Sequence, residues 1–389
     1  MPGIISRLGY PPCVLETGVG AHEMAALETA RDADLVCPAC RRPLEGSGGE
    51  HRCPGCGAAY STRAGVPILL APGSALERGR QAGLHDELSR LHNARKRPIY
   101  WNGGFRYVFN FLIAKHARML AALAPGAGER HLDVGCQDGM ILTNLARRYG
   151  VRGTGVDVSE ASLRLAVARN TAGNRYFLAD AQALPFRDGS FDLAHSVGTM
   201  EHVPDQNLYL SEMARVLRPG GRLLFDMINR RDDWTVHGIE RRWAEFRGRG
   251  EAARQAAIAI GHDPATFREA GEVVAMCHSA RLRVVRVSHY NALFPLLVDA
   301  KAPRLLAAVR GQATDFHGRG LGHAPGDAAG SEPGGEMLAP PPDPGPAGLA
   351  WRRAASLAIR GALPLAELLD KPLTSLGYSN TFYIQAVKE

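Results

Sequence analysis

Residues 131–139 read His-Leu-Asp-Val-Gly-Cys-Gln-Asp-Gly. An apolar, strand-like run passes into a loop with two glycines, and a helical pattern begins directly after it. Glycine lets the backbone approach a ligand closely, and the N-terminus of the following helix favours a negative group. By itself the motif is not specific, because many nucleotide-binding sheets begin in this way.

Strands and helices alternate on the C-terminal side of this motif. The expected strands are 130–135, 152–157, 176–179, 191–197 and 222–228, with helical stretches between most of them. This alternation predicts an α/β protein with a parallel sheet and helices on both faces. A helix at 264–280 and strands at 282–290 and 381–387 are expected to complete the core.

Further motifs follow in a fixed order. Asp157 ends the second strand, where a carboxylate can accept hydrogen bonds from both hydroxyls of a ribose. The others are Asp180-Ala181-Gln182-Ala183-Leu184-Pro185-Phe186, Ser190-Phe191-Asp192-Leu193, Glu201-His202-Val203-Pro204-Asp205 and Arg215-Val216-Leu217-Arg218-Pro219-Gly220-Gly221. With these motifs, residues 130–228 resemble the class I methyltransferases that use S-adenosylmethionine, in the branch that methylates small molecules, quinones and lipids.

The resemblance implies a Rossmann-like sheet of seven strands whose last strand is antiparallel. It also implies a set of cofactor-binding residues: Asp133, Gly135 and Gly139 around the methionine part, Asp157 at the ribose, and Asp180 with Ala181 at the adenine amino edge. Gln137 departs from the pattern, because the family usually has a second glycine there. The Gln137 side chain either narrows the loop or offers its amide to the ligand.

Methyl transfer from a sulfonium is an in-line displacement, so the protein mainly aligns the acceptor and, where needed, removes its proton. His202 is the candidate catalytic base, because it follows the fourth strand at the edge where ligands enter such sheets. Glu201 and His195 are weaker candidates. The alternative is that His202 only packs or orients a loop.

Four cysteines near the N-terminus form two matched pairs. Cys37 and Cys40 enclose Pro-Ala, Cys53 and Cys56 enclose Pro-Gly, and 12 residues separate the pairs. This spacing predicts two tight turns that present four thiolates to one structural Zn²⁺, with disulfides or a redox pair as alternatives. Residues 35–70 resemble the zinc-ribbon proteins that activate certain tRNA and protein methyltransferases. His51 is expected at the surface of this unit.

The expected organisation has a leader at 1–34, a zinc ribbon at 35–72 and a linker with a helical lid at 73–125. The methyltransferase core follows at 126–290, an insertion or cap at 291–378 and the final core strand at 379–389. Within the insertion, 311–348 is rich in Gly, Pro and Ala and is expected to be flexible. Tyr100, Trp101, Phe105 and Tyr107 are expected either in the lid or in the core. Residues 291–297 and 357–369 are expected either to form an apolar cap over the acceptor or to pack on the sheet.

The net charge of +7 is supplied almost wholly by scattered arginines rather than by one basic run. No apolar stretch is long enough to cross a membrane and no secretion signal begins the chain, so a cytoplasmic protein is expected. Neither charge nor composition indicates an oligomeric state.

Three functions remain open from the sequence. The favoured one is methylation of oxygen or carbon on a small-molecule, lipid or glycan-linked acceptor. Because an N-terminal zinc ribbon also resembles certain ribosomal RNA methylating enzymes, a nucleic-acid base is the alternative acceptor, but the ribbon arginines form only a loose set. The third is a non-catalytic partner protein, which would bind little or no cofactor.

Overall fold

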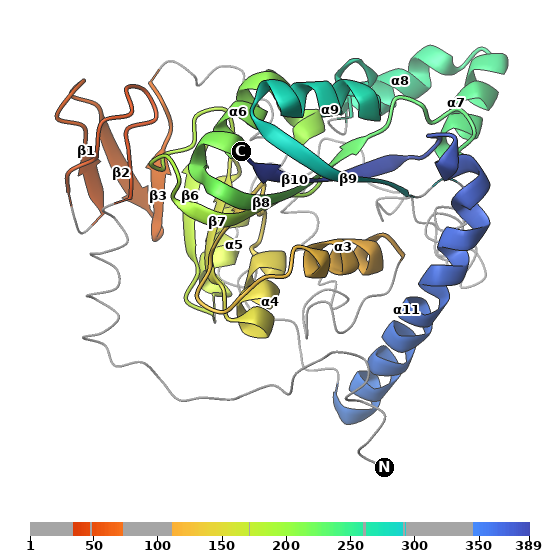
Figure 1. Ribbon diagram of the computed structural model, residues 1–389, viewed down its shortest axis with the longest axis horizontal. Helices are drawn as coiled ribbons and strands as arrows, with labels where there is room; N and C mark the ends of the chain where they lie inside the picture. Colours follow the sequence, from red (N-terminus) through yellow and green to blue (C-terminus); the bar gives the residue numbers. More distant parts are fainter. Residues whose placement is uncertain are drawn as a thin grey trace, which may run out of the picture.

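The computed structural model describes residues 34–46, 49–72, 111–170, 172–259, 262–290, 292 and 345–389. Its centre is a set of parallel strands with the order β6-β5-β4-β7-β8, of which β6, β7 and β8 are labelled in Figure 1. Their bounds are β4 Arg130–Val134, β5 Arg152–Asp157, β6 Arg175–Ala179, β7 Phe191–Ser196 and β8 Leu217–Ile228. The chain runs from β4 towards β6 on one side and from β7 to β8 on the other. The switch point therefore lies between β4 and β7, where open α/β sheets bind their ligands.

Two long strands close one side of the sheet. β10 (Thr381–Lys388) lies between β8 and β9 (Leu282–Tyr290) and is antiparallel to both. The expected antiparallel last strand is therefore present, although it is not at the edge. The seven strands from β6 to β9 match the expected core sheet.

The sheet continues beyond these seven strands, so the prediction that the sheet has seven strands is wrong. β1 (Glu50–Arg52), β2 (Ala59–Arg63) and β3 (Val66–Leu69) form an antiparallel meander, and β3 pairs in parallel with β6. The result is one sheet of ten strands. The physical reason is that β6 would otherwise leave an unpaired edge, and β3 covers it.

Helices cover both faces of the sheet. α3 (Phe111–Ala122), α4 (Met140–Tyr149) and α5 (Glu160–Ala168) lie on one face, and α6 (Gln206–Val216) and α9 (Ala270–Ser279) on the other (Figure 1). α7 (Val236–Phe246) and α8 (Gly250–Ala259) form a separate pair beyond β8. The apolar side chains between helices and sheet, such as Leu132, Phe225 and Ile384, are fully buried.

The helix expected at 264–280 is interrupted. A short 3-10 turn, η4 (Pro264–Thr266), precedes α9, and Phe267 between them has extended backbone. Glu269 and Glu272 form a reciprocal capping box at the start of α9. The local hydrogen bonds of this box begin a new helix instead of continuing the turn.

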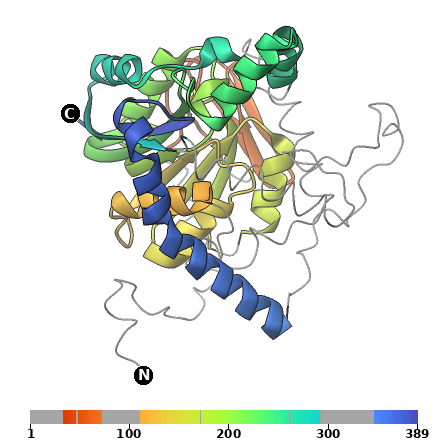
Figure 2. The ribbon, with the colours of Figure 1, turned by 90° about the vertical axis from the view of Figure 1, so that its right-hand side faces the viewer.

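α11 (Gly345–Ser375) runs diagonally along the outside of the α3 side (Figure 2). Leu363 and Ala366 are buried against the cluster that includes residues of α3, and Lys115 donates to Glu367 at 2.7 Å. The described part of the expected cap therefore packs on α3 and β9. The leader up to residue 33, the four aromatic residues of the lid, 293–309 and the expected flexible residues up to 344 lie outside the described residues, whereas 345–348 begin α11.

Candidate functional site

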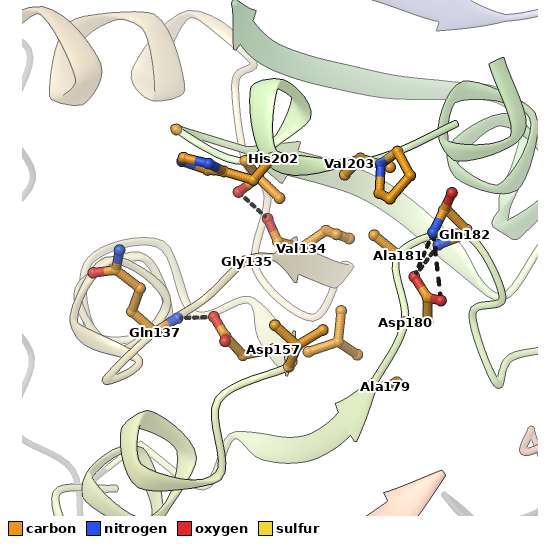
Figure 3. A pocket seen from close by; sticks show the side chains of 15 residues that line it. Val134, Gly135, Gln137, Asp157, Ala179, Asp180, Ala181, Gln182, His202 and Val203 are labelled. Atoms are coloured by element: carbon orange, nitrogen blue, oxygen red, sulfur yellow. Dashed lines mark hydrogen bonds between the residues drawn. The ribbon is translucent and has the colours of Figure 1, made fainter. Parts of the chain in front are cut away.

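A cavity opens at the carboxyl ends of β4, β5, β6 and β7, at the switch point of the sheet (Figure 3). Five of the seven expected cofactor residues line it: Gly135, Gln137, Asp157, Asp180 and Ala181. His202 lines it as well. The other lining residues are Val134, Val156, Val158, Ala179, Gln182, Gly198, Thr199, Val203 and Pro204.

The glycine-containing loop after β4 forms one wall. Gly135 has a φ of +80°, and a Cβ there would clash with the Thr199 side chain. Gln137 also has a positive φ, +47°, and its backbone N–H donates to Oδ2 of Asp157 at 2.8 Å. The family preference for glycine at position 137 thus has a backbone cause, since L side chains rarely adopt this conformation.

Two carboxylates are held at adjacent strand ends. Asp157 accepts from the Gln137 and Ser159 N–H groups, each at 2.8 Å, so its orientation is fixed. Asp180 accepts from the Gln182 backbone N–H at 3.0 Å and from the Gln182 side chain at 3.2 Å. Each carboxylate oxygen can accept more than one hydrogen bond, so both groups can still bind a ligand.

Gln182 is a cavity residue that sequence reasoning did not assign. Its side-chain Oε1 accepts from the Asp205 N–H at 2.9 Å, while its Nε2 donates to Asp180. It thereby ties the loop after β6 to the start of α6. The sequence feature that could have identified Gln182 is its position two residues after Asp180, where a polar side chain can close a local turn.

Asp133 and Gly139 do not line the cavity. Asp133 is buried within β4, and its Oδ1 lies 3.3 Å from Nε2 of His195. His195 Nδ1 in turn lies 2.8 Å from Nε2 of His131, and both rings are fully buried. This network lies in the buried part of β4 and β7, and the role of Asp133 at the cofactor stays a prediction. Gly139 is the N-cap of α4 and packs against the Tyr176 ring, where a Cβ would clash.

His202 ends the short turn η3 (Met200–His202) that follows β7, and Glu201 precedes it. Glu201 is 5% exposed, and burial raises the pKa of its carboxyl to about 7. Asp226, near the end of β8, accepts from the Gly198 N–H at 2.7 Å. Burial, followed by the charge of Glu201, raises the Asp226 pKa to about 8. Two buried carboxyls therefore lie behind the His202 side of the cavity.

The four paired cysteines meet at one point. Their Sγ atoms all lie within 4.8 Å of one another, with 3.6 Å between Cys37 and Cys56 and 3.3 Å between Cys40 and Cys53. Arg41 and Gly57, directly after the second cysteine of each pair, both have positive φ, so the two turns are alike. The expected surface position of His51 is wrong, because β1 places its ring inside the unit at 6% exposure.

This N-terminal unit contacts the loop that carries Asp180. Arg41 donates to the Leu184 carbonyl at 2.9 Å and forms an ion pair with buried Glu212 at 2.8 Å. The Val36 N–H donates to the Pro185 carbonyl at 3.0 Å. The segment that carries the first two cysteines is therefore hydrogen-bonded to the loop that forms one wall of the cavity.

The fold and the cavity together define an α/β protein of the Rossmann-like methyltransferase class. Residues 132–225 match the family model described as a methyltransferase domain. The ubiquinone biosynthesis O-methyltransferase of Paracidovorax citrulli is 32% identical over 201 residues, which cover 49% of this chain and 81% of that protein. The chain therefore belongs to the class I S-adenosylmethionine-dependent methyltransferase family, as its motifs predict.

A second curated relative and one solved structure are also similar to this chain. The O-methyltransferase resE of Aspergillus sclerotiorum is 39% identical over 108 residues, covering 26% of this chain and 41% of that protein. The chain spans about two fifths of the length of the first such curated relatives. The solved structure of the [4+2]-cyclase SpnF aligns with a TM-score of 0.47 at 19% identity, over 80% of this chain and 96% of that one. Among the described residues, no helix has the length and apolar character needed to span a membrane.

Proposed function

We propose that this chain transfers a methyl group from S-adenosylmethionine to a hydroxyl or carbon of a small-molecule, lipid or glycan-linked acceptor. The observation that carries the proposal is the pair of fixed carboxylates, Asp157 and Asp180, in one cavity with the positive-φ loop at Gly135. A ribose fits the first carboxylate and an adenine amino group the second, because both offer hydrogen-bond donors. The methionine part is proposed to lie along the loop at Gly135, which lines the same cavity.

S-adenosylmethionine supplies an electrophilic methyl group on a sulfonium when it is bound. The chain contributes alignment and exclusion of water: Val203 and Pro204 give the cavity an apolar wall next to Ala181. His202 lies on the same lining and is proposed to act on the proton of the acceptor. Figure 3 shows His202 at the edge of the group of side chains that line the cavity.

Hydroxyl methylation is the favoured reaction within this proposal. The relatives from Paracidovorax citrulli and Aspergillus sclerotiorum are both named O-methyltransferases, and the first belongs to ubiquinone biosynthesis. An apolar cavity wall and an adjacent histidine suit a phenol or alcohol on an apolar skeleton. The acceptor class is therefore proposed to be a hydroxylated apolar molecule.

We further propose that Cys37, Cys40, Cys53 and Cys56 hold one structural Zn²⁺. Four thiols from two matching turns form the donor set that zinc takes in closed structural sites. The Tyr60 hydroxyl lies 3.1 Å from the Cys37 sulfur, where it can donate to a thiolate. A small unit with only three short strands needs such a cross-link for its stability.

The test is methyl transfer from labelled S-adenosylmethionine to panels of phenols and quinols, hydroxylated lipids, glycans and total RNA. We expect label in a hydroxylated small molecule, and loss of that label in Asp180→Ala. Label only in RNA would replace the proposal with the base-methylating alternative. Binding of neither cofactor nor its demethylated product would leave the non-catalytic partner as the function.

A further inference from the structure

A second group of metal-ligating side chains lies at the rim of the cavity. One carboxylate oxygen of Glu201 and one ring nitrogen each of His202 and His262 lie within 4.8 Å of one another. Glu201 and His202 come from η3 after β7, whereas His262 comes from the segment between α8 and η4. Two separate segments therefore converge on one point beside the cavity.

The two histidine rings are arranged in parallel. Their centroids lie 5.5 Å apart with an interplanar angle of 21°. Both side chains are partly exposed, so a solvent ion can reach them, while His202 also lines the cavity. A ligand set with one side open to the cavity is the arrangement of a catalytic rather than a closed structural metal site.

The third member, Glu201, is a carboxyl buried beside the two histidine rings. At 5% exposure, its Oε2 has no hydrogen-bond partner among the described residues. An unsatisfied carboxyl oxygen in a buried position is costly, and a bound divalent cation would satisfy it.

We propose that Glu201, His202 and His262 bind a divalent transition-metal ion at the acceptor side of the cavity. Two imidazoles and one carboxylate suit Zn²⁺, Mn²⁺, Fe²⁺ and Co²⁺, and they leave positions open for other ligands. In a tetrahedral site the ligand atoms stand about 3.3 Å apart. Side-chain rotations that move the three ligand atoms by roughly an ångström or two would bring them to these distances.

The consequence for catalysis rests on the proposed function. An acceptor hydroxyl that binds the ion through oxygen loses its proton to water more readily, because the metal lowers its pKa. The oxygen then bonds to the methyl carbon, the carbon–sulfur bond breaks, and its electron pair stays on sulfur. In this arrangement His202 holds the ion and water takes the acceptor proton, so His202 is a metal ligand rather than the base, and the acceptor is a phenol or alcohol rather than a carbon nucleophile.

The test counts Co²⁺ ions bound to the full-length protein after removal of its metals and equilibration with Co²⁺ alone. Cobalt bound to thiolates gives a sulfur charge-transfer absorption that cobalt on nitrogen and oxygen lacks, so the two sites are distinguishable. We expect two ions per wild-type chain. His262→Ala and Glu201→Gln should each retain one ion, with the thiolate absorption intact.

His278→Ala is the matched control, since it removes an exposed histidine on α9 and should keep both ions. One ion per wild-type chain, held by thiolates, would overturn the proposal. So would a second ion that survives in both His262→Ala and Glu201→Gln. Titration with S-adenosylmethionine on the same samples distinguishes failure of the metal site from failure of the proposed function. Two bound ions without cofactor binding would contradict the proposed function and support the metal site.

Discussion

Gln137 occupies a backbone conformation that favours glycine, with a φ of +47°. This conformation costs an L residue about 1–2 kcal/mol. We expect Gln137→Gly to change the free energy of unfolding by less than about 1 kcal/mol, because relief of strain is offset by a more flexible unfolded chain. Gln137→Val should lower it by about 1–3 kcal/mol, since a branched side chain tolerates positive φ poorly. Urea denaturation measures both, and a valine variant as stable as the wild type would contradict this account.

His131 is buried against His195, and burial, followed by the charges of His195 and Arg222, holds its pKa well below the usual value. The folded state keeps this ring neutral, whereas the unfolded state protonates it below about pH 6.5. Stability from His131 is therefore present above pH 6.5 and is lost as the pH falls. We expect the urea midpoint to fall less between pH 7 and pH 5 in His131→Gln than in wild type. Equal falls in the two proteins would refute this assignment.

At the residue scale, five of the seven expected cofactor residues lie on one cavity, and their contact with a ligand stays a prediction. Gly135, Gln137, Asp157, Asp180 and Ala181 line the cavity because a strand followed by a tight loop leaves little freedom at the strand end. Asp133 could not be placed in the same way. Strand periodicity gives its face, but only the packed structure shows that His195 fills the space next to it.

Among the elements, the contact between the N-terminal unit and the Asp180 loop depends on Arg41. Arg41→Ala removes one hydrogen bond to Leu184 and one ion pair to Glu212, which is 4% exposed. We expect a loss of about 1 kcal/mol in the free energy of unfolding and weaker binding of S-adenosylmethionine. Calorimetry and urea denaturation measure the two effects.

Arg63→Ala is the control for this variant. Arg63 belongs to the same unit, but its side chain is 66% exposed and lies 3.8 Å from Glu160. Exposed pairs of this kind contribute little, so Arg63→Ala should leave both measurements nearly unchanged. Equal effects from the two variants would show that loss of positive charge, rather than the Leu184 contact, is responsible.

The sequence predicted most element bounds because strands and helices alternate regularly from 130 to 228. It did not predict the parallel pairing of β3 with β6, since an edge contact between distant segments leaves no local pattern. Nor did helical periodicity show the break at Phe267, where the capping box of Glu269 and Glu272 begins a new helix. The apolar spacing continues through 264–280, but the hydrogen bonds of the capping box set the start of α9.

For the molecule as a whole, the ten-stranded sheet joins the N-terminal unit to the strands of the methyltransferase fold. If zinc holds this unit together, removing the metal should loosen β3 and the neighbouring β6. We expect a chelator to lower the thermal midpoint by about 5 °C or more and to weaken cofactor binding. Readdition of Zn²⁺ should restore both, and an unchanged midpoint after confirmed metal loss would exclude a structural role for zinc.

Binding of S-adenosylmethionine in the cavity at the carboxyl ends of β4 to β7 is the central claim. Calorimetric titration of the metal-loaded protein with S-adenosylmethionine and S-adenosylhomocysteine tests it most directly, with Asp157→Ala as the site variant and exposed Asp188→Ala as its control. We predict saturable binding of both ligands to the wild type and the control, and its loss in a folded Asp157→Ala variant. Absence of binding to the wild type, or equal binding to the folded Asp157→Ala variant, would contradict the claim.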